Sequence, residues 1–385
     1  MRFIHTGDWH VGKTLRGRRR LDEQQQVLGE IVDLARAEQV DAVLVAGDIY
    51  DSASPSAPAQ QLVNQTLIAL GQTGAEVIVI AGNHDHPETF EAYRPLMRLA
   101  GITLAGRVRR RGDGGVHTFT ARGTGEQVNV ALLPFLPRRY AVKAEQIVSQ
   151  DPAANSGRYD AAIRQILAEL AQGFTPDAVN LVIAHLTCTG GRMGGGEREA
   201  QSIFEYHVPA TAFPPEAHYV ALGHLHCRQQ LPAACPVHYC GSPIAVDFGE
   251  EQNTPVVCLV EAMVGRPATV SDHRIRSARR LRTVSGTLDE VLDQAPQTAQ
   301  DWLRVVLREK TRTGLRDQVL AGLPNALEVR IHPDFAGTRA RVTSQHRGRS
   351  PAQLFGDYLE QQGIADPQLM ALFTQIDDEL AQGAS

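Results

Sequence analysis

The sequence predicts a layered α/β fold, in which helices cover the faces of packed β-sheets. Three observations support this prediction. From residue 2 to about residue 275, short apolar runs alternate with amphipathic segments long enough to form helices. Several of the apolar runs end in glycine with a polar residue close behind, as strands do where they enter loops. The length of 385 residues exceeds one ordinary core and predicts roughly two to three domains at ~150 residues each.

The elements of the α/β part follow from the spacing of the apolar residues. The predicted helices span residues 21–38, 56–70 and 159–170. In the first of them, Leu28, Ile31 and Ala35 recur at helical spacing. Between the helices lie short apolar runs that predict strands, at residues 2–5, 42–46, 76–80, 128–133, 179–184 and 219–222. We expect these elements to form one domain over residues 1–278.

The rest of the chain predicts three smaller parts. Residues 279–333 contain a strand, a helix and a second strand without polar residues at the strand ends, which predicts a small α+β domain. Residues 334–349 are polar and basic with little periodicity, as expected of a linker. In the tail, residues 350–385, Ser350-Pro351 and Asp366-Pro367 each predict a helix N-cap followed by proline at the first helical position. We expect two short tail helices with broad apolar faces.

Composition excludes several classes of protein. Apolar residues make up 43% of the chain and charged residues 21%, which is typical of globular proteins and not of disordered or fibrous ones. No run approaches the ~20 apolar residues of a membrane helix, and the first residues lack the layout of a signal peptide. Five cysteines without CxxC spacing argue against a disulfide framework or a zinc ribbon. We therefore expect a cytoplasmic protein with no membrane partner.

Histidine, aspartate and asparagine residues follow the predicted strands, where loops of an open α/β sheet gather ligands. Their oxygen and nitrogen atoms, without thiolates, suit Mn²⁺, and Fe²⁺, Zn²⁺ or Co²⁺ are also chemically compatible. A single such residue is more often a satisfied polar side chain than a ligand, but five segments in this pattern predict a metal site. The segments are Asp8 and His10 in GDWH, Asp48 in AGDIYD, Asn83, His84 and Asp85 in AGNHD, His185 in IAHLT, and His224 and His226 in GHLH.

This set of motifs resembles the signature of the calcineurin-like metallophosphoesterases, over residues 1 to about 250. Within that superfamily the chain resembles the SbcD branch, and the small domain and the tail extend the likeness to nearly the whole chain. The resemblance implies a layered β-sandwich flanked by helices, a small α+β capping domain and a helical tail. We expect the tail to dock an ATPase subunit, and packing of its helices within the chain itself is the alternative. The segments that carry the narrower likeness are HTGDWHVGKTL at 5–15, VDAVLVAGDIYDSASPS at 40–56, VIAGNHD at 79–85, YCGSPIAVDFGEE at 239–251 and SPAQLFGDYL at 350–359.

The resemblance also implies roles for the site residues. His84 would face the scissile phosphate, where it stabilises the transition state or protonates the leaving 3′ oxygen. Asp85 would support catalysis by orienting an imidazole, and capping of the helix that follows is the alternative. Two divalent cations, Mn²⁺ first among the candidates, would be held around a bridging Asp48, one by Asp8, His10, Asp48 and His226 and the other by Asp48, Asn83, His185 and His224.

A cluster of basic residues just after the first metal loop predicts contacts to DNA phosphates. The alternative for such a charge run is a solvated loop. The cluster consists of Lys13, Arg16, Arg18, Arg19 and Arg20. The glycine-rich segment 190–196 lacks the lysine and the Ser/Thr of a P-loop, and we interpret it as a loop at the substrate edge.

These observations together favour an SbcD-like, manganese-dependent DNA nuclease, acting as a 3′–5′ exonuclease on double strands and an endonuclease on single strands. By resemblance, its partners would be DNA and an SbcC-like ATPase, in a homodimer within a heterotetramer associated with the nucleoid, and residues 56–100 would form the dimer interface. It would act in DNA repair, recombination and replication. The alternative is a stand-alone phosphoesterase acting on nucleotides or small phosphodiesters. A DNA-end scaffold with a vestigial site would lack ligands, and none is missing.

Overall fold

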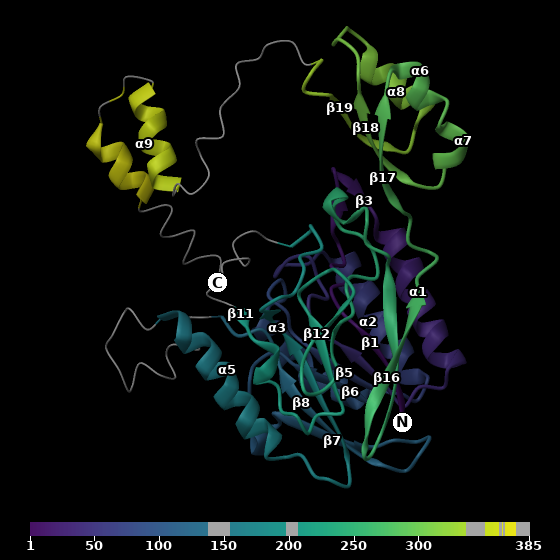
Figure 1. Ribbon diagram of the computed structural model, residues 1–385, viewed down its shortest axis with the longest axis vertical. Coiled ribbons are helices and arrows are strands. Elements are labelled where there is room, and N and C mark those ends of the chain that lie inside the picture. Colours follow the sequence, from purple (N-terminus) through teal and green to yellow (C-terminus); the bar gives the residue numbers. More distant parts are fainter. Residues whose placement is uncertain (138–154, 198–206, 336–350, 362–363, 365, 375–385) are drawn as a thin grey trace. The chain divides into compact units, whose positions relative to one another are not determined.

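The computed structural model describes residues 1–137, 155–197, 207–335, 351–361, 364 and 366–374 (Figure 1). The chain divides into two compact units, Met1–Ile331 and His332–Ser385. The first unit contains the α/β body and a small domain, and the second contains the tail helices. Each unit is described by itself below.

Two six-stranded sheets form the body of the first unit. The first sheet has the strand order β16-β15-β1-β4-β5-β6, and the second has the order β13-β14-β12-β9-β8-β7. The strands of the first sheet are β1 (Arg2–Thr6), β4 (Ala42–Val45), β5 (Glu76–Ile80), β6 (Ile102–Ala105), β15 (Val256–Met263) and β16 (Arg266–Arg274). Those of the second are β7 (Val116–Thr120), β8 (Gln127–Leu133), β9 (Val179–His185), β12 (Tyr219–Gly223), β13 (Gln229–Leu231) and β14 (Val237–Tyr239).

The two sheets pack face to face because both faces of their central strands are apolar. Along β1, Phe3 points into the core between the sheets, while Ile4 points to the helices outside. In β4, Leu44 points into the core between the sheets and Val45 points to the helices outside. Within the described part of the body, the inner core lies between the sheets and a further apolar layer lies on the outside of each sheet. This is the β-sandwich of the predicted fold.

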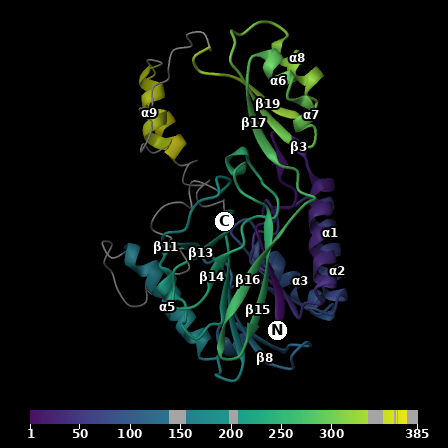
Figure 2. The same cartoon turned by 45° about the vertical axis from the view of Figure 1, so that its right-hand side comes forward.

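Helices cover the outer faces of the sandwich (Figure 2). Val27 of α1, Leu62 of α2 and Phe90 of α3 pack in one cluster with the first sheet. On the other side, Ile163 and Leu167 of α5 pack on the second sheet. These helices are α1 (Leu21–Ala37), α2 (Ala57–Gln72), α3 (Pro87–Leu99) and α5 (Asn155–Ala171). The predicted α/β layers flanked by helices are confirmed, and the three predicted helices correspond to α1, α2 and α5.

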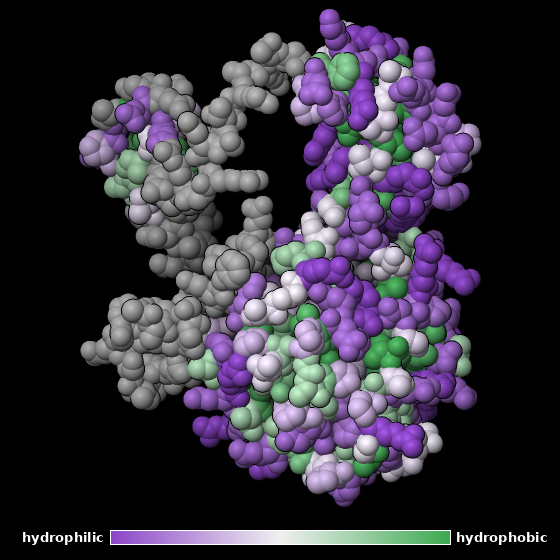
Figure 3. All heavy atoms as spheres, in the orientation of Figure 1, coloured by the Kyte–Doolittle hydropathy of each residue, from purple (hydrophilic) through white to green (hydrophobic). Residues whose placement is uncertain are grey.

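The small domain is a three-stranded parallel sheet with three short helices, which is one strand and two helices more than the sequence predicts. The additional strand, Trp302–Leu307, lies at the centre of the sheet. It contributes Leu303 and Val305 to the core of the domain. Figure 3 shows mostly hydrophilic residues on the visible face of this domain. Its elements are β17 (Leu281–Gly286), α6 (Leu288–Leu292), α7 (Ala295–Thr298), β18 (Trp302–Leu307), α8 (Leu315–Gly322) and β19 (Ala326–Ile331).

Short elements connect these parts. The loop after β1 forms a small hairpin of β2 (Thr14–Leu15) and β3 (Arg18–Arg19), which leads directly into α1. A 3-10 turn, η6 (Phe248–Glu250), precedes β15. Phe248 of this turn packs with Leu281 and Trp302 of the small domain. The other short elements are β10 (Thr187–Cys188), β11 (His207–Val208), η1 (Arg111–Asp113) and η5 (Ala210–Ala212).

The second unit contains two short helices, α9 (Pro351–Gln361) and a helix at 367–374. Asp366 caps the second helix, since its Oδ1 accepts the backbone N–H of Gln368 at 2.9 Å. The rings of Phe355 and Phe373 stack with centroids 4.2 Å apart, so the two helices pack on each other. The predicted cap at Ser350 and most of the predicted linker lie outside the described residues. In the described part of the chain, no helix combines the length and the apolar character needed to cross a membrane.

Candidate metal centre

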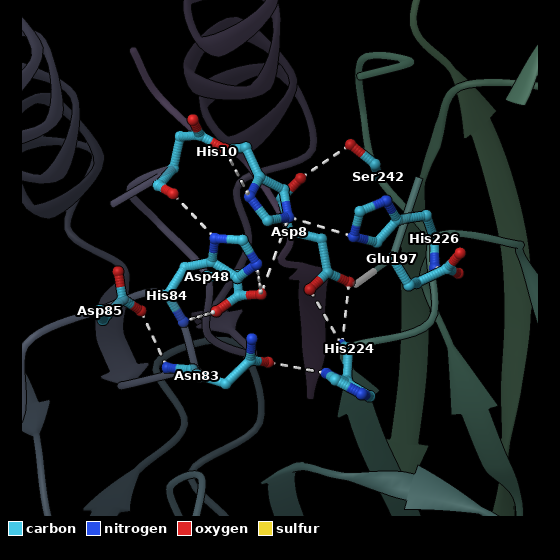
Figure 4. A network of polar contacts seen from close by, with 12 residues as sticks. Asp8, His10, Asp48, Asn83, His84, Asp85, Glu197, His224, His226 and Ser242 are labelled. Carbon is cyan, nitrogen blue, oxygen red and sulfur yellow. Dashed lines mark hydrogen bonds and ion pairs between the residues drawn. The ribbon is translucent and has the colours of Figure 1, made fainter. Parts of the chain in front are cut away.

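All seven predicted metal ligands meet at one end of the two sheets. All of them except His185 are labelled in Figure 4. Asp8 and His10 follow β1, Asp48 follows β4, and Asn83 follows β5. The second sheet contributes His185 at the end of β9, and His224 and His226 after β12. These two strands pair in parallel, and His185 lies opposite Gly223, the residue that precedes His224. The carboxyl ends of these parallel strands therefore bring together residues that are up to 218 positions apart in the sequence, counted from Asp8 to His226.

The loops reach this point through unusual backbone conformations. Asp8, His10, Asp48 and His224 have positive φ angles of 51°, 45°, 50° and 98°. Such angles are uncommon for residues with side chains and concentrate at functional sites. Gly82 packs so closely on Asp48 that a Cβ there would overlap its carboxylate. The glycine that precedes Asn83 is therefore required by the space beside Asp48.

Asp8, His10 and His226 form the first group of candidate ligands, all of them buried. His10 Nε2 and His226 Nε2 lie 3.1 Å apart. Asp48 borders this group, because its Oδ2 lies 3.7 Å from His10 Nε2. The Asp8 carboxylate is held in place by the backbone N–H of His224, which lies 2.9 Å from Oδ1 and 3.2 Å from Oδ2.

Asp48, His185 and His224 form the second group, which Asn83 joins. His185 Nε2 lies 3.5 Å from Asp48 Oδ2. The amide oxygen of Asn83 lies 2.9 Å from His185 Nε2 and 2.8 Å from His224 Nδ1. Asp48 thus borders both groups, which is the geometry that a bridging carboxylate needs.

The hydrogen-bond roles of the imidazoles fit a cation at each position. His226 Nδ1 lies 2.6 Å from a Glu250 oxygen, and His185 Nδ1 lies 2.7 Å from the carbonyl oxygen of Ala46, so both nitrogens donate. Without a cation, burial opposes protonation of His185, but the charge and hydrogen bond of Asp48 outweigh it and raise its pKa to about 9. Burial likewise opposes protonation of His226, but the carboxylate of Glu250 outweighs it and raises the pKa to about 10. A cation at each position would replace these protons, and the neutral rings would then present a lone pair at Nε2. The donor set of carboxylate, amide oxygen and imidazole fits a divalent metal.

The surroundings shift the pKa values of the two aspartates in opposite directions. Burial raises the pKa of Asp8 to about 6. Burial also opposes ionisation of Asp48, but the charges of His185, His10 and His84 outweigh it and hold its pKa well below the usual range. Burial lowers the pKa of His224 to about 3 and the charge of His185 adds to this effect. A cation at the site favours carboxylate and neutral imidazole, which are the states that ligate.

His84 lies beside the ligands and is held at two atoms. Its backbone N–H donates to Asp48 Oδ1 at 2.8 Å, and its ring Nδ1 lies 2.8 Å from the carbonyl oxygen of Asp51. Its Nε2 lies 4.0 Å from Asp48 Oδ2, and its ring meets the ring of His10 edge to face at 4.7 Å. His84 also falls in a group with His10 and Asp48 that could hold an ion, so geometry alone permits a ligand role as well as the expected catalytic one.

Asp85 has different partners from those expected of it. Its carboxylate accepts the backbone N–H groups of Gly82 at 2.8 Å, Tyr50 at 3.0 Å and Ile49 at 3.3 Å. No imidazole is among the hydrogen-bond partners described for it, and the N-cap of α3 is His86. Asp85 therefore fastens the loop after β4 to the loop after β5, and neither expected role describes these contacts.

The basic cluster divides into buried and exposed members. Arg20 is only 4% exposed, and its guanidinium donates to both oxygens of Glu23 at 2.9 and 2.8 Å. The prediction that Arg20 contacts DNA is therefore wrong, because its guanidinium pairs with Glu23 inside the protein, where phosphates do not reach. Arg18 and Arg19 remain exposed, and Arg18 lies over the ring of Trp302 at 4.6 Å.

The other two members of the cluster take part in ion pairs at the surface. Lys13 pairs with Asp51 at 3.0 Å. Arg16 pairs with Glu328 at 3.0 Å and with Asp247 at 3.1 Å. Both cations are partly neutralised by these carboxylates, so they are weaker candidates for phosphate contacts than Arg19.

Two carboxylates that sequence reasoning left without a role lie directly behind His226. Glu250 Oε1 is the partner of its ring Nδ1, and Glu197 Oε1 accepts its backbone N–H at 2.9 Å. Glu250 belongs to the quoted segment 239–251, so its place in a motif was visible, but its contact with His226 was not. Ser242 of the same segment donates its hydroxyl to the carbonyl oxygen of Asp8 at 2.7 Å.

Comparisons with known proteins agree with the resemblance that the motifs predict. A family model described as "Calcineurin-like phosphoesterase" matches residues 1–228, and one described as "Type 5 capsule protein repressor C-terminal domain" matches residues 277–363. A Bacillus subtilis protein, named as the D component of the SbcCD nuclease, is 32% identical over 98% of this chain and 97% of its own length. Proteins of the same name are 35% identical in Rhodobacter capsulatus, over 65% of this chain and 64% of theirs, and 31% in Escherichia coli K12, over 77% and 74%.

Proposed function

Because this chain belongs to the calcineurin-like phosphoesterases and, within them, to the SbcD family of nucleases, we propose that it is a manganese-dependent DNA nuclease. It would hydrolyse phosphodiester bonds as a 3′–5′ exonuclease on double strands and as an endonuclease on single strands. It would act with an SbcC-like ATPase in DNA end processing at the nucleoid.

One observation carries this proposal: the buried carboxylate of Asp48 lies between two groups of candidate ligands, with Oδ2 3.7 Å from His10 Nε2 and 3.5 Å from His185 Nε2. Asp8, His10 and His226 would hold one cation with Asp48, and Asn83, His185 and His224 would hold the other. When bound, two divalent cations at these positions would lower the pKa of bound water and neutralise negative charge on a phosphodiester during its displacement. We propose Mn²⁺ because the ligands combine oxygen with imidazole nitrogen and include no thiolate.

The residues of the chain itself then orient the substrate and move protons. His84 Nδ1 donates to the carbonyl oxygen of Asp51, and Nε2 faces the candidate ligands, 4.0 Å from Asp48 Oδ2, so we propose Nε2 as the ring atom that acts on the substrate. A protonated His84 can donate from Nε2 to the phosphate or to the leaving 3′ oxygen, a contribution typically worth ~10² to 10⁴ in rate. Asp85 holds the two loops from which Asp48 and His84 project. Arg18 and Arg19 would contact phosphates without reading bases.

We propose that the rest of the chain provides partner surfaces. On α2 and α3, large apolar side chains are exposed, 41% at Ile68, 65% at Leu96 and 87% at Leu99, as a homodimer interface within residues 56–100 requires. The tail, residues 350–385, would dock the ATPase subunit, and residues 279–333 would act as the capping domain. A small-ester phosphoesterase needs none of these parts, and the likeness to the B. subtilis protein extends over 98% of this chain.

The test is the substitution Asp48→Ala, with Asp33→Ala on the exposed face of α1 as the matched control. Removing the shared carboxylate should abolish manganese-dependent cleavage of linear plasmid DNA and lower the metal content at both positions. Metal content, by elemental analysis after equilibrium dialysis, and cleavage would be measured on the same samples. Retention of two ions by Asp48→Ala would overturn the bridging role. Absence of cleavage by the unmodified chain, with Mn²⁺ and with the ATPase partner, would overturn the proposed function.

A further inference from the structure

The buried carboxylate of Glu250 lies against a proposed metal ligand, yet the mechanism above does not use it. Glu250 is 1% exposed and ends the turn η6. Its Oε1 lies 2.6 Å from His226 Nδ1, on the side of the ring opposite to Nε2, the atom proposed to bind metal. His226 is labelled in Figure 4, where its ring extends toward Asp8 and His10.

Both oxygens of Glu250 act as acceptors, which explains why this position needs a carboxylate. Oε1 faces the ring N–H of His226, and Oε2 accepts the backbone N–H of Val246 at 2.9 Å. A glutamine of the same shape has one oxygen and one NH₂ group. In either orientation of the amide, one of the two donors would face another donor.

A second carboxylate fixes the backbone of the same histidine. Glu197 Oε1 accepts the N–H groups of His226 at 2.9 Å and Gly194 at 2.5 Å, and Oε2 accepts the N–H of Gly195 at 2.7 Å. The next glycine, Gly196, packs against Glu250 so closely that a Cβ would overlap its carboxylate. The glycine-rich segment and η6 thus pack closely against each other next to His226.

The second group of ligands has no such support. The ring of His185 is oriented by a backbone carbonyl, that of Ala46. His224 Nδ1 faces the side chain of Asn83, which is itself a proposed ligand. Among the described residues, a hydrogen bond from a ligand imidazole to a carboxylate outside the ligand set is therefore found only in the first group.

We propose that Glu250 is a positioning residue that sets the metal affinity of the first position, the one formed by Asp8, His10 and His226. The proposal rests on the proposed function, because it assumes that these residues bind metal. By accepting the Nδ1 proton, Glu250 fixes the tautomer in which Nε2 carries the lone pair, and it holds the ring at one angle. Loss of such a partner typically lowers metal affinity by ~10 to 100-fold.

The experiment compares Glu250→Gln with Glu251→Gln, the adjacent residue, whose carboxylate pairs with the hydroxyl of Thr283 in the small domain. Mn²⁺ binding to the full chain is measured by calorimetry and by electron paramagnetic resonance. We expect Glu250→Gln to bind one ion as the unmodified chain does and the other ~10 to 100-fold more weakly. At intermediate Mn²⁺ its spectrum should be that of an isolated ion, where the unmodified chain gives the spectrum of a coupled pair. Glu251→Gln should match the unmodified chain.

Each outcome decides the proposal. Unchanged affinity at both positions in Glu250→Gln, or an equal loss at both, overturns it. If Glu250→Gln does not fold, as judged by circular dichroism, Glu250→Asp takes its place. This variant keeps the charge but is one methylene too short for the 2.6 Å contact, and unchanged binding in it also overturns the proposal. If the unmodified chain binds no Mn²⁺, the proposed function itself fails, which separates that failure from a failure at Glu250 alone.

Discussion

Substitution of Glu23 by glutamine tests whether a buried charge joins the small domain to the body. Glu23 lies in the first turn of α1 and receives two hydrogen bonds from the Arg20 guanidinium. It also accepts the indole N–H of Trp302 and the backbone N–H of Arg279, each at 2.9 Å. Four donors from both parts therefore meet on one carboxylate. The change to glutamine keeps the shape and removes the charge.

The magnitude follows from the burial of the pair. Glu23 is 8% exposed and Arg20 is 4% exposed, so the variant leaves a guanidinium in the interior without its counter-charge. Breaking a buried ion pair in this way costs about 3 to 5 kcal/mol. The amide oxygen of glutamine can still accept from one donor, so we expect a loss near the lower limit, about 3 kcal/mol.

The same contacts predict how this stabilisation depends on pH. Burial raises the pKa of Glu23, but the hydrogen bonds and charge of Arg20, with Trp302 and Arg279, outweigh it, so the net pKa is lowered from 4.5. A carboxylate with a lowered pKa in the folded state stabilises the fold above its unfolded pKa. This contribution is lost as the pH falls through the lower, folded pKa. The difference in stability between Glu23→Gln and the unmodified chain should therefore be full at pH 7 and shrink below about pH 4.5.

The assay is urea unfolding, monitored by the fluorescence of Trp302. The variant Trp9→Phe serves as background, because it removes the other tryptophan of the chain. The matched control is Asp22→Asn, an exposed carboxylate in the same helical turn. We expect the midpoint of the Trp302 transition to fall for Glu23→Gln and not for the control. A change within about 0.5 kcal/mol, the usual range for surface substitutions, would refute the assignment of this ion pair to the joint.

Three further predictions concern catalysis, DNA and the partner. His84→Gln should keep both metals and DNA binding while kcat falls by ~10² to 10⁴, and loss of metal in this variant would make His84 a ligand. Alanine at Arg18 and Arg19 together should weaken DNA binding uniformly and flatten its salt dependence, with hydrolysis of a chromogenic phosphodiester unchanged; an unchanged salt slope would indicate a solvated loop. Deletion of residues 350–385 should keep manganese-dependent cleavage of single strands and abolish co-purification with the ATPase, and equal recovery of the truncated chain would place docking elsewhere.

The sequence determined those features that depend on near neighbours along the chain. The strands at residues 2–5, 42–46 and 76–80 were visible because apolar side chains fill both faces of a central strand. The candidate ligands were visible because each lies at the end of a strand or a few residues beyond it, and strand direction alone brings such residues to the same edge of a sheet. The positive φ angles at Asp8 and Asp48 accompany the adjacent glycines, which were part of the same motifs.

Only the tertiary structure decided which polar groups are buried and what they contact. Arg20 and Arg19 are adjacent and chemically identical, yet one is 4% exposed and pairs with Glu23 while the other faces solvent. Arg20 also donates to the carbonyl oxygen of Ala245, which is 225 positions away. The partner of Glu23 in the small domain is 279 positions away. The free energy of a charge depends on its burial and its nearest dipoles, and both are set by segments that are distant in sequence and become neighbours only when the chain has folded.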